Sequence, residues 1–117
     1  ALVARRSKRF EREKTPENER LRSKFHLEED ALILQEYNCA LIYADGSSKG
    51  KLYVTQHYLC FSGSLFGKDT KAVYPLEDVV TLEPTDSPAP NSMLMTSTSS
   101  EERFTFLAGR QHAMSTI

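Results

Sequence analysis

The sequence predicts a mainly β domain, a meandering antiparallel sandwich or barrel of seven short strands. Short runs rich in aromatic and β-branched residues recur at spacings of about 10 residues. Several of these runs alternate apolar and polar side chains, and clusters of Gly, Pro, Ser, Asn and Asp separate them. The chain has 117 residues, 39% of them hydrophobic, a length that suits a single domain.

Each predicted strand follows from its local pattern. In the second, we expect Leu52 and Val54 on one face of the sheet and Tyr53 on the other, because side chains alternate along a strand. In the last, Phe104 and Phe106 share a face by the same rule. The seven predicted strands cover residues 36–44, 51–55, 58–63, 70–75, 79–83, 92–98 and 103–107. The predicted turn and loop segments include residues 45–48, 64–69 and 99–102.

Short helices are predicted at both ends of this β region. A Thr cap followed by Pro16 predicts a helix over residues 16–24, although its many charges leave it without a clear apolar face. Three acids followed by Ala, Leu, Ile and Leu predict a second short helix over residues 28–34, because acids suit a helix N-terminus. Residues 109–114 predict the start of a final helix that is cut short, so we expect the chain to be part of a longer protein.

Charge is distributed unevenly along the chain. Residues 1–24 hold nine basic and four acidic groups, a balance of +5, whereas residues 25–117 hold six basic and twelve acidic groups, a balance of −6. A basic arm of this kind suits contact with an anionic surface or with nucleic acid. A solvated leader without a binding role has the same composition, so charge alone leaves both interpretations open.

The composition argues against a membrane-spanning protein, a disulfide-stabilised protein and a metal or cofactor site. The longest stretch without Asp, Glu, Lys or Arg covers residues 52–67 and is broken by Gln, His and hydroxyl side chains, whereas a membrane span needs about 20 apolar residues. Cys39 and Cys60 lie in apolar runs, where a reduced cysteine acts as a small hydrophobe, so we expect a reducing, cytosolic compartment. The three histidines are scattered, and we expect neither a metal nor a cofactor.

Several motifs, in order and with matching spacing, resemble a GRAM domain. They are Phe25-His-Leu with Tyr37-Asn-Cys39-Ala-Leu41, Gly50-Lys-Leu-Tyr-Val-Thr-Gln-His-Tyr-Leu-Cys60-Phe61-Ser, Ser64-Leu65-Phe66-Gly67-Lys68-Asp69-Thr70-Lys71 and Val73-Tyr-Pro-Leu76-Glu-Asp78-Val79. The resemblance covers about residues 25–107, with most of it in 50–79. We therefore expect a basic N-terminal arm over residues 1–24 and a GRAM domain over 25–117 with an incomplete C-terminal helix.

The resemblance implies a pleckstrin-homology-like fold, seven antiparallel strands in two bent sheets with one end closed by the C-terminal helix. If strands 1, 2 and 3 pair in order, the backbones of Cys39 and Cys60 lie about 9.5 Å apart, beyond the roughly 7 Å limit for a disulfide. We therefore expect two free thiols. One position departs from the family: the residue after Gly67, often aromatic there, is Lys68. That change shifts the emphasis from hydrophobic insertion to charge.

In the implied fold, the connections between strands 1 and 2, 3 and 4, and 6 and 7 gather at one open end. Cations there suit the phosphates of lipid head groups. Two alternatives stay open. The cations belong to an ordinary soluble surface, because acidic residues share the same loops, and the apolar candidates fold back onto the barrel. The lipid-binding candidates are Lys49, Lys51, Lys68, Lys71 and Arg103, and the membrane-insertion candidates are Leu65 and Phe66.

The resulting hypothesis is a cytoplasmic, peripheral membrane-targeting module that binds anionic lipid, either phosphoinositide or phosphatidylserine. The alternative is a protein-interaction module that docks a peptide or partner on a sheet edge or beside the C-terminal helix. We expect no enzyme, because no nucleophile–base arrangement and no glycine-rich phosphate loop occurs in the sequence. Nucleic acid is not expected as a partner, because the predicted sheet lacks a basic face with aromatic residues.

Overall fold

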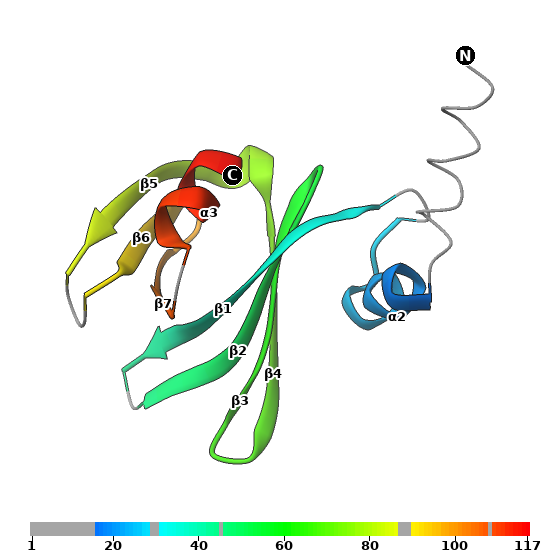
Figure 1. The fold of residues 1–117 in the computed structure, drawn as a ribbon, viewed down its shortest axis with the longest axis horizontal. Coiled ribbons are helices and arrows are strands. Elements are labelled where there is room, and N and C mark those ends of the chain that lie inside the picture. Colours follow the sequence, from blue (N-terminus) through cyan, green and yellow to red (C-terminus); the bar gives the residue numbers. More distant parts are fainter. Residues whose placement is uncertain (1–15, 29–30, 45, 87–89, 108) are drawn as a thin grey trace.

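The computed structural model describes residues 16–28, 31–44, 46–86, 90–107 and 109–117 (Figure 1). Within these ranges, two helices flank seven strands and a short 3₁₀ turn, η1. The strands confirm the predicted number and order. In chain order the elements are α2 (Pro16–Phe25), β1 (Ile33–Tyr43), β2 (Gly46–Thr55), β3 (Tyr58–Leu65), β4 (Lys68–Pro75), η1 (Leu76–Asp78), β5 (Val79–Thr85), β6 (Ser92–Ser97), β7 (Glu101–Phe106) and α3 (Arg110–Thr116).

All seven strands belong to one hydrogen-bonded antiparallel sheet in the order β4-β3-β2-β1-β7-β6-β5. Figure 1 shows that the sheet is strongly bent, so the two layers expected from the resemblance are the two halves of one continuous sheet. Helix α3 packs inside the bend, whereas α2 lies on the opposite, outer face beside β2 and β3 (Figure 1). We call these two sides the inner and outer faces.

The main core lies on the inner face and follows the predicted alternation. Leu52 and Val54 point into it, and Tyr53 points to the outer face. Phe61 and Phe104 are fully buried, with ring centroids 6.1 Å apart in an edge-to-face arrangement. Burying a side chain of this size contributes about 1.5–3 kcal/mol, so this aromatic pair is a main source of stability.

Helix α2 confirms the predicted element but corrects one expectation about it. Leu21 and Phe25, one helical turn apart, are buried against Tyr53 and Cys60 on the outer face. The ring centroids of Phe25 and Tyr53 are 6.0 Å apart. The expectation of no apolar face was wrong, because two large side chains at i and i+4 suffice to dock a helix among charged neighbours.

The second predicted helix, over residues 28–34, is wrong. Strand β1 begins at Ile33 and pairs with Thr55 of β2. The Leu32 amide donates a hydrogen bond to the side chain of Gln56, 2.8 Å away. Two of the three acids, at 29 and 30, lie outside the described residues. Pairing with a distant strand outweighs the local helix signal here, since most helical stability comes from packing.

The cysteine prediction is confirmed. Cys39 lies on β1 and Cys60 on β3, with β2 between them, and both thiols are free and buried. Burial raises the pKa of each thiol to about 12, although the Leu52 backbone, which hydrogen-bonds Cys39, opposes the shift at that residue. Both groups therefore remain protonated and unreactive at neutral pH.

Candidate functional site

The β1–β2 and β3–β4 hairpins end side by side at one end of the sheet. In the register of β2 and β3, Lys49 lies opposite Ser64, which brings the start of β2 next to the β3–β4 turn. Both turns are tighter than predicted: β2 begins at Gly46, inside the expected 45–48 turn, and only Phe66 and Gly67 separate β3 from β4. Two compact hairpin ends are therefore present where the sequence predicts longer turn and loop segments.

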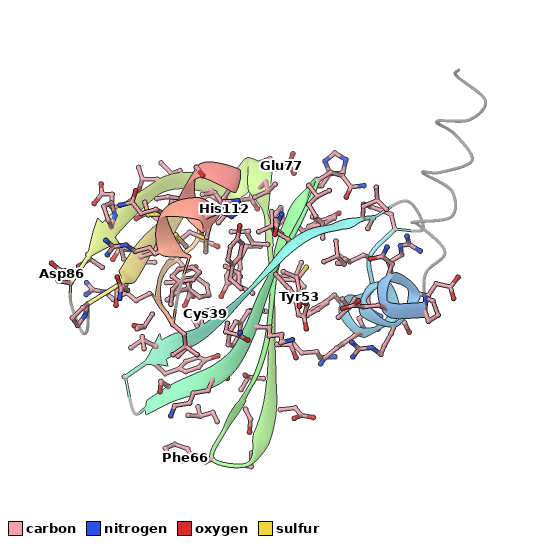
Figure 2. All side chains as sticks on the ribbon, viewed as in Figure 1. Cys39, Tyr53, Phe66, Glu77, Asp86 and His112 are labelled. Carbon is pink, nitrogen blue, oxygen red and sulfur yellow. The ribbon has the colours of Figure 1, made fainter. Side chains whose placement is uncertain are left out.

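Phe66 occupies an unusual position in the β3–β4 turn. Its φ is 51° and that of Gly67 is 78°, the left-handed pair of values that a two-residue hairpin turn requires and that Asn-Gly normally supplies. A residue with a Cβ costs about 1–2 kcal/mol in this region. The Phe66 side chain is nevertheless 78% exposed, so burial does not repay that cost. In Figure 2 it lies at the extreme end of the hairpin.

The Phe66 ring is seated on Gly46. A Cβ placed on Gly46 would lie 3.2 Å from Cζ of Phe66 and 3.3 Å from Cδ1 of Leu65. Tyr43, the last residue of β1 and 36% exposed, pairs directly with Gly46 and leaves the strand on the same face. We call Tyr43, Gly46, Leu65 and Phe66 the apolar tip. Of the two insertion candidates, Leu65 is partly covered and Phe66 is exposed.

The five predicted cations do not form one cluster around this tip. Lys51, Ser62 and Lys71 form one row across β2, β3 and β4. Side chains in such a row share a face, which here is the outer one, and Lys49 shares it because it lies two residues from Lys51. Lys68, the first residue of β4, is exposed and leaves the strand on the other face. Arg103 lies on β7 opposite Ile42, away from the β3–β4 turn.

Two of these lysines have partners within the described residues. Nζ of Lys51 lies 3.6 Å from Oε1 of Glu36 on the neighbouring strand. Nζ of Lys71 donates a hydrogen bond to the carbonyl oxygen of Lys24, 3.2 Å away, at the C-terminal end of α2. Each exposed contact of this kind contributes about 0–1 kcal/mol, so a stronger anion can displace it. Both lysines therefore have a local structural role as well.

Helix α2 adds charges to the outer face that the sequence interpretation did not assign to the site. Burial is the main cause that raises the pKa of Tyr53, Glu36 raises it further, and Lys51 and Arg20 of α2 lower it. Arg20 therefore lies in the same electrostatic environment as Lys51. The pair Leu21 and Phe25 was the available signal, because it is the part of the helix that packs against this face.

Other features of the described residues suggest no chemistry. Within the described ranges, no group of three or more His, Cys, Asp or Glu side chains is arranged to hold a metal ion. The Nδ1 atom of His112 in α3 lies 2.6 Å from the hydroxyl oxygen of Tyr37 in β1. This hydrogen bond holds α3 against β1. No helix in the described ranges has the length and apolar character needed to cross a membrane.

Two shallow hollows lie away from the apolar tip, each about 210 Å³ in volume. The first lies between the edge strand β5 and the C-terminal end of α3 and is lined mainly by apolar residues, of which Val80 is 63% exposed. The second is more polar and lies beside the β2–β3 turn. The first is lined by Leu76, Val79, Val80, Thr81, Leu82 and Ile117, and the second by Gln56, His57, Tyr58, Pro75, Leu76 and Glu77.

Comparison with solved structures supports the architecture. The C-terminal domain of an unknown protein from Leishmania infantum superposes with a TM-score of 0.68, covering 84% of this chain and 91% of that one. The two sequences are 22% identical, so the similarity concerns the fold alone.

Comparison of sequences identifies the family. The chain is 42% identical over 50 residues to GRAM domain-containing protein 2A of Homo sapiens and 31% identical over 85 residues to Cyclic GMP-binding protein D of Dictyostelium discoideum. It is 32% identical over 62 residues to Protein VASCULAR ASSOCIATED DEATH 1, chloroplastic, of Arabidopsis thaliana. These matches cover 43%, 73% and 53% of this chain but only 14%, 6% and 10% of the three relatives, respectively. The family model of the GRAM domain matches residues 10–116, and the chain therefore belongs to the GRAM domain family.

Proposed function

We propose that this domain is a non-catalytic membrane-targeting module that binds anionic lipid, phosphoinositide or phosphatidylserine, at the cytoplasmic face of a membrane. GRAM domain proteins are in general membrane-associated and lipid-binding, which supports the class of partner. The observation that carries the proposal is Phe66, an exposed aromatic side chain held at a hairpin apex and followed two residues later by Lys68. Two free, buried thiols are in keeping with a reducing compartment.

The apolar and charged parts of this end have different tasks in the proposal. A basic side chain near an anionic leaflet contributes about 1 kcal/mol, so four or five give roughly 4–5 kcal/mol, equivalent to dissociation near the millimolar range. Transfer of one Phe side chain out of water adds about 1.5–3 kcal/mol, a further factor of ten to a hundred. To bind lipid, Lys51 must lose its ion pair with Glu36, and Lys71 must lose its hydrogen bond to the Lys24 carbonyl oxygen. The binding free energy from the cations is therefore smaller than this sum.

Co-sedimentation with anionic liposomes tests the proposal. The quadruple variant Lys49→Glu, Lys51→Glu, Lys68→Glu and Lys71→Glu reverses the charge of the three strand lysines on the outer face and of Lys68 beside the tip. We expect it to lose binding, and we expect wild-type binding to weaken steeply as salt is added, because charges more than about 8 Å apart are screened at physiological salt. A matched control, Arg5→Glu, Arg6→Glu, Lys8→Glu and Arg9→Glu, makes the same charge change in the basic arm. Persistent binding of the first variant would show that the lipid surface lies elsewhere.

The second candidate function, docking of a protein partner, is favoured by the hollow between β5 and α3. Its lining is largely apolar, and β5 is an edge strand with β6 as its partner in the described sheet. A peptide there would add to a strand edge or fill the hollow. Binding of such a peptide would change little as salt is added, whereas lipid binding by exposed lysines would be lost at high salt. Val80→Lys would block the hollow and leave lipid binding unchanged.

A further inference from the structure

The two hairpin ends form one preorganised unit rather than two independent loops. The Phe66 ring meets the backbone of β2 at Gly46 so closely that a Cβ there would lie 3.2 Å from Cζ of the ring, and the ring would have to shift by a few tenths of an ångström. Leu65 approaches the same point, and Tyr43 is held beside it by its register with Gly46. Residues from two hairpins therefore fix the direction in which the one strongly exposed ring of the tip projects.

From this arrangement we infer that Gly46 is a positioning residue for membrane contact, and that the apolar tip selects bilayers with loosely packed head groups rather than one particular head group. The inference rests on the proposed function. A ring already fixed in its projecting direction loses little conformational freedom when it inserts. The apolar tip presents one exposed ring and two partly covered side chains, a small area that gains most where acyl chains are already accessible.

The charges near the tip favour a bilayer as the occupant. Lys68 is exposed directly after the turn, and Lys49 lies on the outer face of the adjacent strand. Asp69, also exposed, lies in the same cross-strand row as Lys49 through Ser64. Lys51 and Lys71 are in contact with Glu36 and the Lys24 carbonyl. This mixed arrangement suits general attraction to an anionic surface, with no preformed cradle for one phosphate among the described residues.

The experiment compares binding to small, strongly curved vesicles with binding to large, flat vesicles of the same phosphatidylcholine–phosphatidylserine mixture. Curvature opens head-group packing without changing lipid chemistry. We expect the wild-type protein to bind the small vesicles several-fold more tightly. Phe66→Asn keeps a residue that suits the left-handed turn and should weaken binding by about tenfold or more and abolish the preference.

Gly46→Ala tests the position of the Phe66 ring without changing its chemistry. It keeps the Tyr43, Leu65 and Phe66 side chains and displaces the Phe66 ring by a few tenths of an ångström. We expect a several-fold loss of binding to small vesicles and a smaller size preference, with the thermal unfolding midpoint monitored to show that the fold persists. The matched control is Leu107→Asn, because Leu107 is 82% exposed and lies outside the tip. It should bind as the wild type does.

The outcomes separate this inference from the proposed function. If the wild type binds neither size of these vesicles, and also neither size when phosphoinositide replaces phosphatidylserine, the proposed function fails and the inference fails with it. If the wild type binds both sizes equally, or Phe66→Asn retains the preference, the proposed function stands and the selection by packing is overturned. If Phe66→Asn weakens binding but a folded Gly46→Ala variant binds unchanged, the positioning role of Gly46 is overturned.

Discussion

Two phenylalanines of one hairpin, five residues apart, have opposite environments. Phe61 on β3 is fully buried against Phe104, whereas Phe66 at the apex is 78% exposed in a left-handed turn. The first contributes to stability through packing, and the second costs backbone free energy without burial in return. The difference indicates that this hairpin has a structural half and a contact half, and substitutions in the two halves should behave differently.

The largest effect is expected in the structural half. Phe61→Ala leaves a cavity beside Phe104 and should lower the free energy of unfolding by about 3–5 kcal/mol. Urea denaturation followed by circular dichroism measures it. A loss below about 1 kcal/mol would show that Phe61 is not a central core residue, and the distinction between the two halves would disappear.

A smaller effect is expected where α2 docks on the outer face. Phe25→Ala removes the ring that packs on Tyr53 and should destabilise the docking of α2 by about 3 kcal/mol, the low end of the range for a buried Phe→Ala change. The effect should be local, because the strands keep their own core on the inner face. Hydrogen exchange should become faster for the α2 amides while those of β2 and β3 remain protected. Equal acceleration in both regions would mean that α2 and the sheet unfold as one unit.

In the contact half, a substitution should raise the free energy of unfolding instead of lowering it. Phe66→Asn places a residue suited to positive φ in the turn and should raise the free energy of unfolding by about 1 kcal/mol while it weakens membrane binding. Gly67→Asn is the matched control, since it keeps the ring of Phe66 and a Cβ there meets no atom within 4 Å; because the φ of Gly67 is 78°, this change should not raise the free energy of unfolding. If Phe66→Asn destabilises the domain, Phe66 has a packing role that its exposure conceals.

The smallest effect concerns the ion pair on the outer face. Glu36→Gln removes the partner of Lys51, and because both side chains are nearly half exposed, the free energy of unfolding should fall by less than about 1 kcal/mol. The same change frees Lys51, so binding to anionic vesicles should increase slightly at low salt. A decrease in vesicle binding would show that Lys51 does not face the lipid.

Much of the fold was predictable because strand periodicity is a local property. The alternation of Leu52, Tyr53 and Val54 gave their faces correctly, and the motif spacing gave the family. The helix predicted over residues 28–34 failed, because Ile33 pairs with a residue 22 positions away. No local rule places a phenylalanine at positive φ, so the sharp turn at Phe66 was predicted as a longer loop.

The candidate site was predictable only in part, for the same reason. Side-chain chemistry selected Leu65, Phe66 and the lysines, but register decides which of them meet. The contact between Lys51 and Glu36 depends on the pairing of β1 with β2, and the seat on Gly46 depends on how two hairpins end. Both are long-range relations that a single strand does not encode.

The membrane contact of Phe66 is tested most directly by a fluorescent reporter at that position. The chain contains no tryptophan, so Phe66→Trp introduces a single emitter at the tip. On addition of anionic vesicles, we predict a blue shift of its emission and strong quenching by lipids brominated on the acyl chains. An emission spectrum that stays unchanged while the protein co-sediments with the vesicles would contradict the contact, because the domain would then bind lipid through another surface.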